Sequence, residues 1–291
     1  MYPAAETLIQ FPDVGHSEDV SCGRRKGEDM QRSLWSAASG MTAQQMNIDV
    51  LSNNLSNVNT MGFKKSRAFF EDLMYQELKA AGSYSAAGLS HPTGIQVGLG
   101  TKVGAVEKVH TQGSLQTTEV QTDLAIQGAG YFQFTLPNGD IGYTRSGSLK
   151  IDANGNLTNE NGYLLEPAVT IPDNTSSIAI GEDGTISVTI NGENEPQEVG
   201  QIELAAFINP SGLKSLGKNF YTPTGASGEP VTGTPGEGNL GTVEQGTLEM
   251  SNVSVVEDMV NMITAQRAYE VNSKAIQTSD EMLQILNNLK R

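Results

Sequence analysis

The chain has 291 residues, of which 37% are hydrophobic and 32 are glycine, a composition typical of a folded protein with many turns. Its net charge of -15 at pH 7 repels phosphate groups, which argues against nucleic acid and anionic membranes as partners. Cys22 is the only cysteine, so the sequence supports neither a disulfide framework nor a cysteine-based metal site.

The N-terminal part gives no sign of a membrane or a secretory segment. No apolar run is long enough to span a bilayer, and the basic and then apolar layout of a cleaved secretory signal is missing. We therefore expect no direct membrane insertion, and any export to proceed without a cleaved signal peptide. Residues 1–29 show no hydrophobic periodicity, and we expect them to be an extra N-terminal extension, either disordered or lying before the true start at Met30.

An amphipathic helix is predicted for residues 30–62. Apolar residues recur every seven positions at Leu34, Met41, Ile48 and Leu55, and a second series three positions later includes Leu51. The flanks carry mostly serine, threonine, asparagine and glutamine, whereas a free surface helix usually carries many charges. The apolar stripe is therefore predicted to pack against other helices.

Asparagine is dense at the end of this helix, in the stretch VLSNNLSNVN. It is a weak helix former because its amide competes for backbone hydrogen bonds. At helical spacing, Asn53, Asn54 and Asn57 form an amide patch beside the apolar stripe. One interpretation is a frayed, solvated helix end. The interpretation that we favour is an interface in which these amides bridge neighbouring subunits, where a buried charge would be too costly.

Residues 113–225 are predicted to form an outer, all-β domain. Asn-Gly or Asp-Gly pairs begin at positions 138, 154, 161, 183 and 191 and separate short alternating runs, the pattern of successive β-hairpins. Most of the charge lies here, since residues 113–250 contain 17 acidic and 4 basic residues. Residues 63–112 are predicted to be an extended connector into this domain, and residues 226–252 the return connector.

A second apolar-periodic helix is predicted for residues 253–291, with a repeat of seven through Ala268, Ala275, Met282 and Leu289. The expected fold class is therefore mixed α and β, with N- and C-terminal helices forming a coiled-coil-like core domain and an all-β, hairpin-rich domain inserted between them. Two helices that touch along one stripe bury too little apolar surface to offset the entropy of ordering them. We therefore expect other copies of the chain to complete their packing.

No pattern indicates catalysis, a cofactor or a metal. His16, His91 and His110 are far apart in the sequence and match no metal-ligand spacing. Residues 152–162 look only faintly like a calcium loop, because the glycine and the last residue do not fit. We expect no enzyme, and we assign the candidate site to assembly contacts: Leu34, Met41, Ile48, Leu51, Asn53, Asn54, Leu55, Asn57, Val260, Ile263, Ala275, Met282 and Leu286.

Several stretches carry a family resemblance. VLSNNLSNVNTMGFKKSR resembles the N-terminal signature of the bacterial flagellar axial proteins, and SNVSVVEDMVNMITAQRAYEVNSKAIQTSDEMLQ is similar to the C-terminal helix of their rod and hook members. DLAIQGAGYFQF, YTRSGSLKIDANGNL and GYLLEP are similar to the β domain of the same proteins. The stretch FFEDLMYQELKAAGSYSAAGLSHPTGIQVGLGTKV, after the asparagines, resembles the distal rod members of that family.

The resemblance implies a structural subunit of the distal rod in the flagellar basal body, where the rod crosses the periplasm. Such subunits polymerise into a rigid helical drive shaft that transmits torque from motor to hook. The implied partners are other copies of the chain, proximal rod and hook proteins at the two ends, and the surrounding peptidoglycan and outer-membrane ring proteins. Two alternatives stay open: a hook or proximal rod subunit, and, from a different class, a secreted β protein that binds or hydrolyses glycans.

Overall fold

The computed structural model describes residues 18–81, 84–86, 89–90, 93–191 and 195–289. Residues 1–17 of the expected extension, with His16, lie outside the described residues, as does His91. The chain divides into two compact units. Unit 1 comprises Met1–Gln45, Phe70–Lys102 and Gln266–Arg291, and unit 2 comprises Met46–Phe69 and Val103–Ala265.

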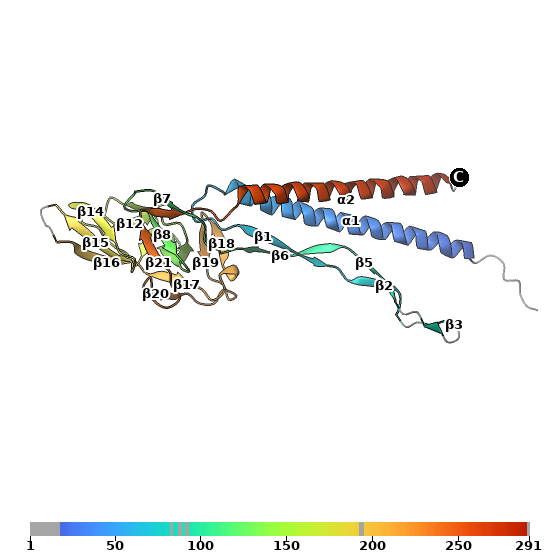
Figure 1. The fold of residues 1–291 in the computed structure, drawn as a ribbon, viewed down its shortest axis with the longest axis horizontal. Coiled ribbons are helices and arrows are strands. Elements are labelled where there is room, and N and C mark those ends of the chain that lie inside the picture. The colour runs from blue at the N-terminus through green and yellow to red at the C-terminus, as the bar shows by residue number, and fades with distance from the viewer. Residues whose placement is uncertain (1–17, 82–83, 87–88, 91–92, 192–194, 290–291) are drawn as a thin grey trace, which may run out of the picture. The chain divides into compact units, whose positions relative to one another are not determined.

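One long helix lies at each end of the described chain (Figure 1), namely α1 (Glu18–Ser56) and α2 (Val255–Leu289). We expected the first helix over residues 30–62, and α1 both begins and ends earlier than that. The segment that follows α1 forms three short antiparallel pairs: β1 (Ser66–Asp72) with β6 (Thr101–Lys108), β2 (Tyr75–Lys79) with β5 (Ile95–Gly98), and β3 (Tyr84–Ala86) with β4 (Leu89–Ser90).

The remaining strands belong to unit 2, with a single 3-10 turn, η1 (Pro210–Gly212), among its described residues. They are β7 (Leu115–Thr117), β8 (Leu124–Gln127), β9 (Tyr131–Thr135), β10 (Ile141–Thr144), β11 (Leu149–Ile151), β12 (Leu157–Asn159), β13 (Leu164–Glu166), β14 (Thr175–Ile180), β15 (Thr185–Ile190), β16 (Gln197–Gln201), β17 (Leu204–Ala206), β18 (Lys214–Gly217), β19 (Phe220–Thr222), β20 (Val231–Gly233), β21 (Thr242–Gln245) and β22 (Thr247–Glu249).

A 9-stranded sheet organises unit 2 around β9. Strand β10 pairs along one side of β9, whereas β13 and β17 share its other side, and β20 extends the sheet beyond β17. A 3-stranded sheet follows in the order β14-β15-β16, and two further pairs, β8 with β21 and β7 with β22, join early strands to late ones. The outgoing and the returning chain are therefore hydrogen-bonded to each other.

The hairpin turns of unit 2 lie where the Asn-Gly and Asp-Gly pairs predict them. Gly139, Gly155, Gly162 and Gly184 have φ between +78° and +83°, the left-handed conformation that such turns require. Each lies between two antiparallel strands, β9–β10, β11–β12, β12–β13 and β14–β15. The prediction of successive hairpins is confirmed for these four pairs.

The core of unit 2 consists of large apolar side chains from many of its strands and loops. Its fully buried members come from segments that are far apart in the sequence: Leu124, Ile126, Phe132, Phe134, Leu149, Leu165, Ile186, Val188, Ile202 and Leu204. At roughly 1.5 to 3 kcal/mol for each fully buried large side chain, this cluster supplies most of the favourable free energy available to the unit.

Within unit 1, the two helices approach each other through small residues. The hydroxyl oxygens of Ser33 and Ser279 are 3.4 Å apart. Gly40 lies against the side chain of Asn272, where an added Cβ would come within 2.8 Å of Nδ2. Close contact is possible here because neither helix presents a bulky side chain.

The expected fold class is wrong. More of the described chain lies in strands than in helices, and the border between the two units cuts through both helices, so no helical core domain with an inserted β domain exists. Met282 and Leu289 of the predicted repeat are 54% and 77% exposed, whereas Ala37 and Ala43 are buried. A coiled coil interlocks large apolar side chains. Apart from Leu51, the buried apolar residues of these helices are alanines, so the seven-residue repeat does not become a two-helix seam among the described residues.

Candidate assembly interface

Asn54 lies near the end of α1 and fixes the chain reversal that follows. Its Nδ2 donates a hydrogen bond to the backbone oxygen of Ser66 at 2.8 Å, and its Oδ1 accepts the Ser66 backbone N–H, also at 2.8 Å. Only an amide offers a donor and an acceptor side by side in this way. The side chain is 1% exposed, so both halves of the amide are satisfied inside the chain.

Asn57 caps the last turn of α1. Its Nδ2 donates to the backbone oxygen of Asn53 at 2.9 Å, and its Oδ1 accepts a hydrogen bond from the Thr60 hydroxyl at 3.2 Å. Gly62 then takes a φ of +67° and donates its N–H to the backbone oxygen of Glu249 at 2.8 Å. The asparagine-rich stretch therefore ends the helix and turns the chain onto the strand that precedes α2.

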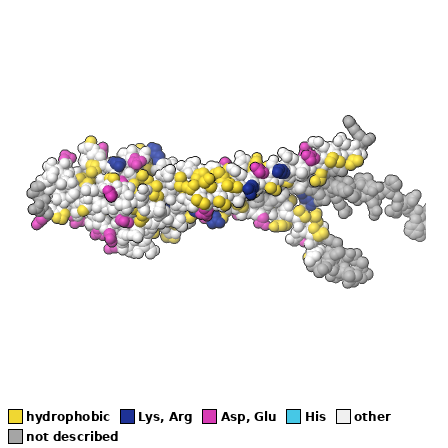
Figure 2. All heavy atoms as spheres, turned by 45° about the horizontal axis from the view of Figure 1, so that its top comes forward, with side chains coloured by type: hydrophobic (Ala, Val, Ile, Leu, Met, Phe, Trp, Pro, Cys, Tyr) yellow, Lys and Arg dark blue, Asp and Glu magenta, His cyan; other side chains and the backbone are white. Residues whose placement is uncertain are grey.

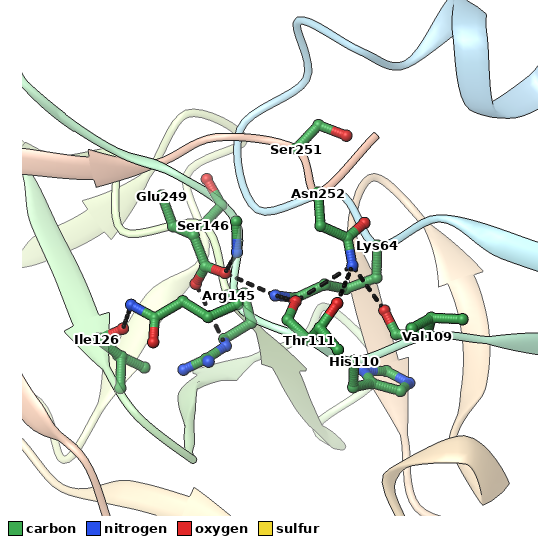
Figure 3. Close-up of polar contacts among 12 residues, drawn as sticks. Lys64, Val109, His110, Thr111, Ile126, Arg145, Ser146, Glu249, Ser251 and Asn252 are labelled. Carbon is green, nitrogen blue, oxygen red and sulfur yellow. Dashed lines mark hydrogen bonds and ion pairs between the residues drawn. The ribbon is translucent and has the colours of Figure 1, made fainter. Parts of the chain in front are cut away.

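Lys64, Glu249 and Arg145 form a buried ion cluster, which we call the junction cluster (Figure 3). Lys64 Nζ lies 2.6 Å from Glu249 Oε1 and donates to the backbone oxygen of Thr111 at 2.7 Å. Arg145 Nε lies 3.3 Å from Glu249 Oε2. The three side chains are 4% exposed or less, so their charges depend on one another rather than on water.

Burial and neighbouring charges set the titration of this region. Burial lowers the pKa of Lys64, and the attraction of Glu249 opposes that shift. Burial also lowers the pKa of His110 to about 4, with further contributions from the positive charges of Lys64, Lys108 and Arg145. A low pKa favours the neutral form of His110, whose Nδ1 lies within hydrogen-bond distance, 2.7 Å, of the Tyr131 hydroxyl oxygen.

Asn252 joins three segments just before α2 begins (Figure 3). Its Oδ1 accepts the Lys65 backbone N–H at 2.7 Å, while its Nδ2 donates to the backbone oxygens of Val109 and Thr111 at 2.8 and 3.1 Å. Each contact satisfies a backbone group that would otherwise need another partner. Through this amide, the starts of β1 and α2 and the end of β6 are held together.

A groove of about 550 Å³, which we call the junction groove, lies between the last turns of α1 and the first turns of α2. Its walls include Leu51 and Asn54 on one side and Asp258 and Asn261 on the other. Asp258 is 4% exposed, and its Oδ2 makes no hydrogen bond to any described residue. Burial raises the pKa of Asp258, Lys65 lowers it, and Glu257 raises it further.

Apolar side chains face solvent beside this groove. Val256, Met259, Val260 and Ile263, which we call the α2 patch, are 75%, 50%, 55% and 48% exposed. Figure 2 shows hydrophobic side chains gathered over the start of α2. Contiguous apolar surface of this kind marks a site of association rather than a feature of a free monomer.

The structure brings only some of the predicted interface residues together. Leu51 and Asn54 line the junction groove, and Val260 and Ile263 belong to the α2 patch next to it. Five further predicted residues in or just after α1 are half-buried: Leu34, Met41, Ile48, Leu55 and Asn57. Three are exposed, namely Asn53 on α1 and Ala275 and Met282 on α2. The side chain of Leu286 lies outside the described residues.

Sequence reasoning missed the junction cluster and Asn252. Lys64 and Glu249 are 185 positions apart, and nothing in the spacing of a lone lysine and a lone glutamate links them. The missing information was a long-range backbone contact, the hydrogen bond from the Gly62 N–H to the Glu249 oxygen, which holds Glu249 near the end of α1.

The described residues can be assessed for metal-ion sites and for membrane-spanning helices. They contain no group of three or more histidine, cysteine, aspartate or glutamate side chains arranged to hold a metal ion. None of the helices in the described part of the chain could cross a membrane. The described residues combine a packed β core with long helices that leave large apolar side chains exposed to solvent, a combination found in structural and interaction proteins.

Comparison with known proteins identifies the family. Three family models match: "Flagella basal body rod protein" at residues 34–64, "Flagellar hook protein FlgE/F/G D1 domain" at 125–188, and "Flagellar basal body rod FlgEFG protein C-terminal" at 244–289. The chain is 53% identical to flagellar basal-body rod protein FlgG of Borreliella burgdorferi, across 90% of this chain and 100% of the relative. It is 46% identical to FlgG of Caulobacter vibrioides, across 89% and 99%, and 41% identical to FlgG of Bacillus subtilis, across 90% and 100%.

The chain therefore belongs to the flagellar basal-body rod protein FlgG family, the structural proteins of the flagellar rod. The predicted resemblance to flagellar rod and hook proteins is confirmed.

Proposed function

We propose that this chain is a subunit of the distal rod of the flagellar basal body, and that copies of it polymerise into a rigid helical shaft that transmits torque from motor to hook. Its FlgG relatives are basal-body rod proteins, which supports this role. Torque transmission makes and breaks no covalent bond, so the role requires no catalytic group, and we propose that the protein is not an enzyme.

The exposed α2 patch is the observation that carries the proposal. Burying a large aliphatic side chain fully is worth about 1.5 to 3 kcal/mol, so a patch that is half or more exposed leaves several kcal/mol for association. Other large apolar residues of unit 2 are also exposed, but the four residues of the α2 patch lie on successive turns of one helix and so expose their apolar groups together.

We further propose that the assembly contacts include the predicted residues of both helices. On α1 these are Leu34, Met41, Ile48, Leu51, Asn53, Asn54, Leu55 and Asn57, and on α2 they are Val260, Ile263, Ala275, Met282 and Leu286. Asn54 contributes by shaping the junction groove, because its own amide is satisfied by Ser66. A contact between two different surfaces of the same chain generates an open helical filament when its rotation does not close into a ring, which is the geometry that we propose here.

A position in the distal rod implies which proteins would lie next to this chain. Proximal rod and hook proteins would contact the two ends of the polymer, and the peptidoglycan and outer-membrane ring proteins would surround it.

Substitution within the α2 patch tests this function. Val260→Gln removes an apolar group that contributes to assembly but not to the folded monomer, whereas Val120→Gln makes the same change at a site that is 43% exposed and away from the helices. We expect Val260→Gln to abolish rods in purified basal bodies viewed by electron microscopy, with monomer stability unchanged within about 0.5 kcal/mol. Normal rods and swimming in Val260→Gln cells would refute the role of the patch.

A further inference from the structure

Met259 is the one side chain of the α2 patch that a mild oxidant can modify. The other three members, Val256, Val260 and Ile263, carry saturated aliphatic groups, whereas Met259 carries a thioether sulfur. Met259 lies in the second turn of α2 and is 50% exposed. Small solutes therefore reach this side chain as long as the patch faces water.

The helical neighbours of Met259 have nothing that could solvate a polar group. On a helix, a side chain lies beside those three and four positions away. For Met259 these neighbours are Val255, Val256, Met262 and Ile263, and none of their side chains has an N–H or O–H group to donate. A polar group formed at Met259 would therefore be hydrated by water in the free chain and would find no donor side chain among these neighbours once the patch is covered.

Oxidation of methionine creates such a polar group. A sulfur lone pair attacks one oxygen of hydrogen peroxide, the O–O bond breaks, and a proton passes to the departing hydroxide to give water. The sulfur is oxidised by two electrons to the sulfoxide, and the peroxide is reduced by the same two electrons. The sulfoxide oxygen is a polar hydrogen-bond acceptor, and burying it without a donor should weaken an apolar contact by about tenfold or more.

We propose that Met259 is a regulatory oxidation site, at which a two-electron oxidant such as hydrogen peroxide converts the free chain into a form that cannot bury its α2 patch. The contact that covers the patch also shields the sulfur, so the modification acts on subunits before assembly and spares finished rods. A thiol-dependent methionine sulfoxide reductase would restore the thioether. This inference rests on the proposed function, because it is assembly that covers the patch.

The experiment uses the purified full chain, oxidised in part with hydrogen peroxide and then allowed to polymerise. Sedimentation separates polymer from free chain, and peptide mass spectrometry measures the sulfoxide at each methionine. We expect the Met259 sulfoxide to be at least tenfold depleted in the polymer relative to the free chain. The sulfoxide of Met74, which is 84% exposed and lies outside the α2 patch, is the internal control and should differ less than twofold between the fractions.

Two variants supply a second readout. Met259→Leu keeps an apolar side chain that peroxide cannot oxidise, and Met74→Leu is the matched control. Peroxide should raise the critical concentration of the unmodified chain and of Met74→Leu at least tenfold above untreated samples of the same protein. The corresponding rise for Met259→Leu should be less than twofold. Treatment of the oxidised, unmodified chain with the reductase and a thiol should restore polymerisation.

The outcomes separate this inference from the function on which it rests. An even distribution of the Met259 sulfoxide between polymer and free chain would overturn it, as would an equal rise in the critical concentration of Met259→Leu after peroxide, which would place the sensitivity at another methionine. Failure of the untreated, unmodified chain to polymerise at all would instead reject the proposed function.

Discussion

The strands of unit 2, which we call the β unit, and the two terminal helices differ in how far their large apolar side chains are buried. In the β unit, Phe132, Phe134 and Leu165 are fully buried within one chain. On α2, Val256 and Leu289 are 75% and 77% exposed. The first region has a buried apolar core, whereas the second leaves several large apolar side chains in water. The residues that form the buried core and the residues that we propose for association therefore lie in different parts of the sequence.

The place where the two regions meet is held by polar groups. Where α1 ends and α2 begins, the contacts are the junction cluster and the amides of Asn54 and Asn252. Hydrogen bonds of this kind specify direction more sharply than apolar packing does, since they lose strength steeply when misaligned. The polar junction therefore fixes the end of α1 and the start of α2 within unit 2.

Removing the central carboxylate should have the largest effect on this arrangement. Glu249→Gln leaves Lys64 and Arg145 buried with no anion between them, and we expect the free energy of unfolding to fall by about 3 to 5 kcal/mol. Urea denaturation followed by circular dichroism measures it. Glu244→Gln, at an exposed site on β21, is the matched control and should change stability by less than about 0.5 kcal/mol. Equal stability of both variants would mean that the cluster contributes nothing to the β unit.

A smaller loss is expected at the chain reversal. Asn54→Asp keeps the acceptor for the Ser66 N–H but replaces the donor to the Ser66 oxygen with a second, charged oxygen. Leaving a buried group unsatisfied costs about 1 to 3 kcal/mol, and more when the group is charged. Asn53→Asp makes the same chemical change at an exposed position and should be nearly neutral. Urea midpoints of the two variants provide the comparison, and a neutral Asn54→Asp would show that the Ser66 contact is dispensable.

The mildest effect is a dependence on pH. The pKa of His110 is lowered to about 4 in the folded chain from 6.5, so the unfolded chain binds the proton more tightly. Stability should therefore fall as pH drops from about 6.5 towards 4, and His110→Gln should lose that part of the slope. Unfolding midpoints between pH 4 and pH 7 for both proteins check this. Parallel curves would show that His110 does not titrate as the structure indicates.

The β unit was the part best predicted from the sequence. The Asn-Gly and Asp-Gly pairs specify turns locally, so four hairpins could be placed without knowing any distant contact. Burial of an asparagine near the end of α1 was also expected, although the partner of Asn54 is Ser66 of the same chain rather than a second subunit.

Contacts between distant segments could not be predicted in this way. The repeat through Met282 and Leu289 indicated a coiled coil, but periodicity shows only which residues share a face and not what covers that face. The pairing of Lys64 with Glu249 depends on the backbone contact between Gly62 and Glu249. That contact joins segments far apart in the sequence, so no local pattern near either residue could reveal it.

The separation between Lys64 and Glu249 has a consequence for the order in which the protein matures. Synthesis runs from the N-terminus, so 185 further positions must be made before the ammonium meets its carboxylate. During that interval the Asn54 contact with Ser66 can already form, but the Lys64 ammonium has no carboxylate beside it. A chain that stops short of Glu249 therefore leaves the junction cluster incomplete.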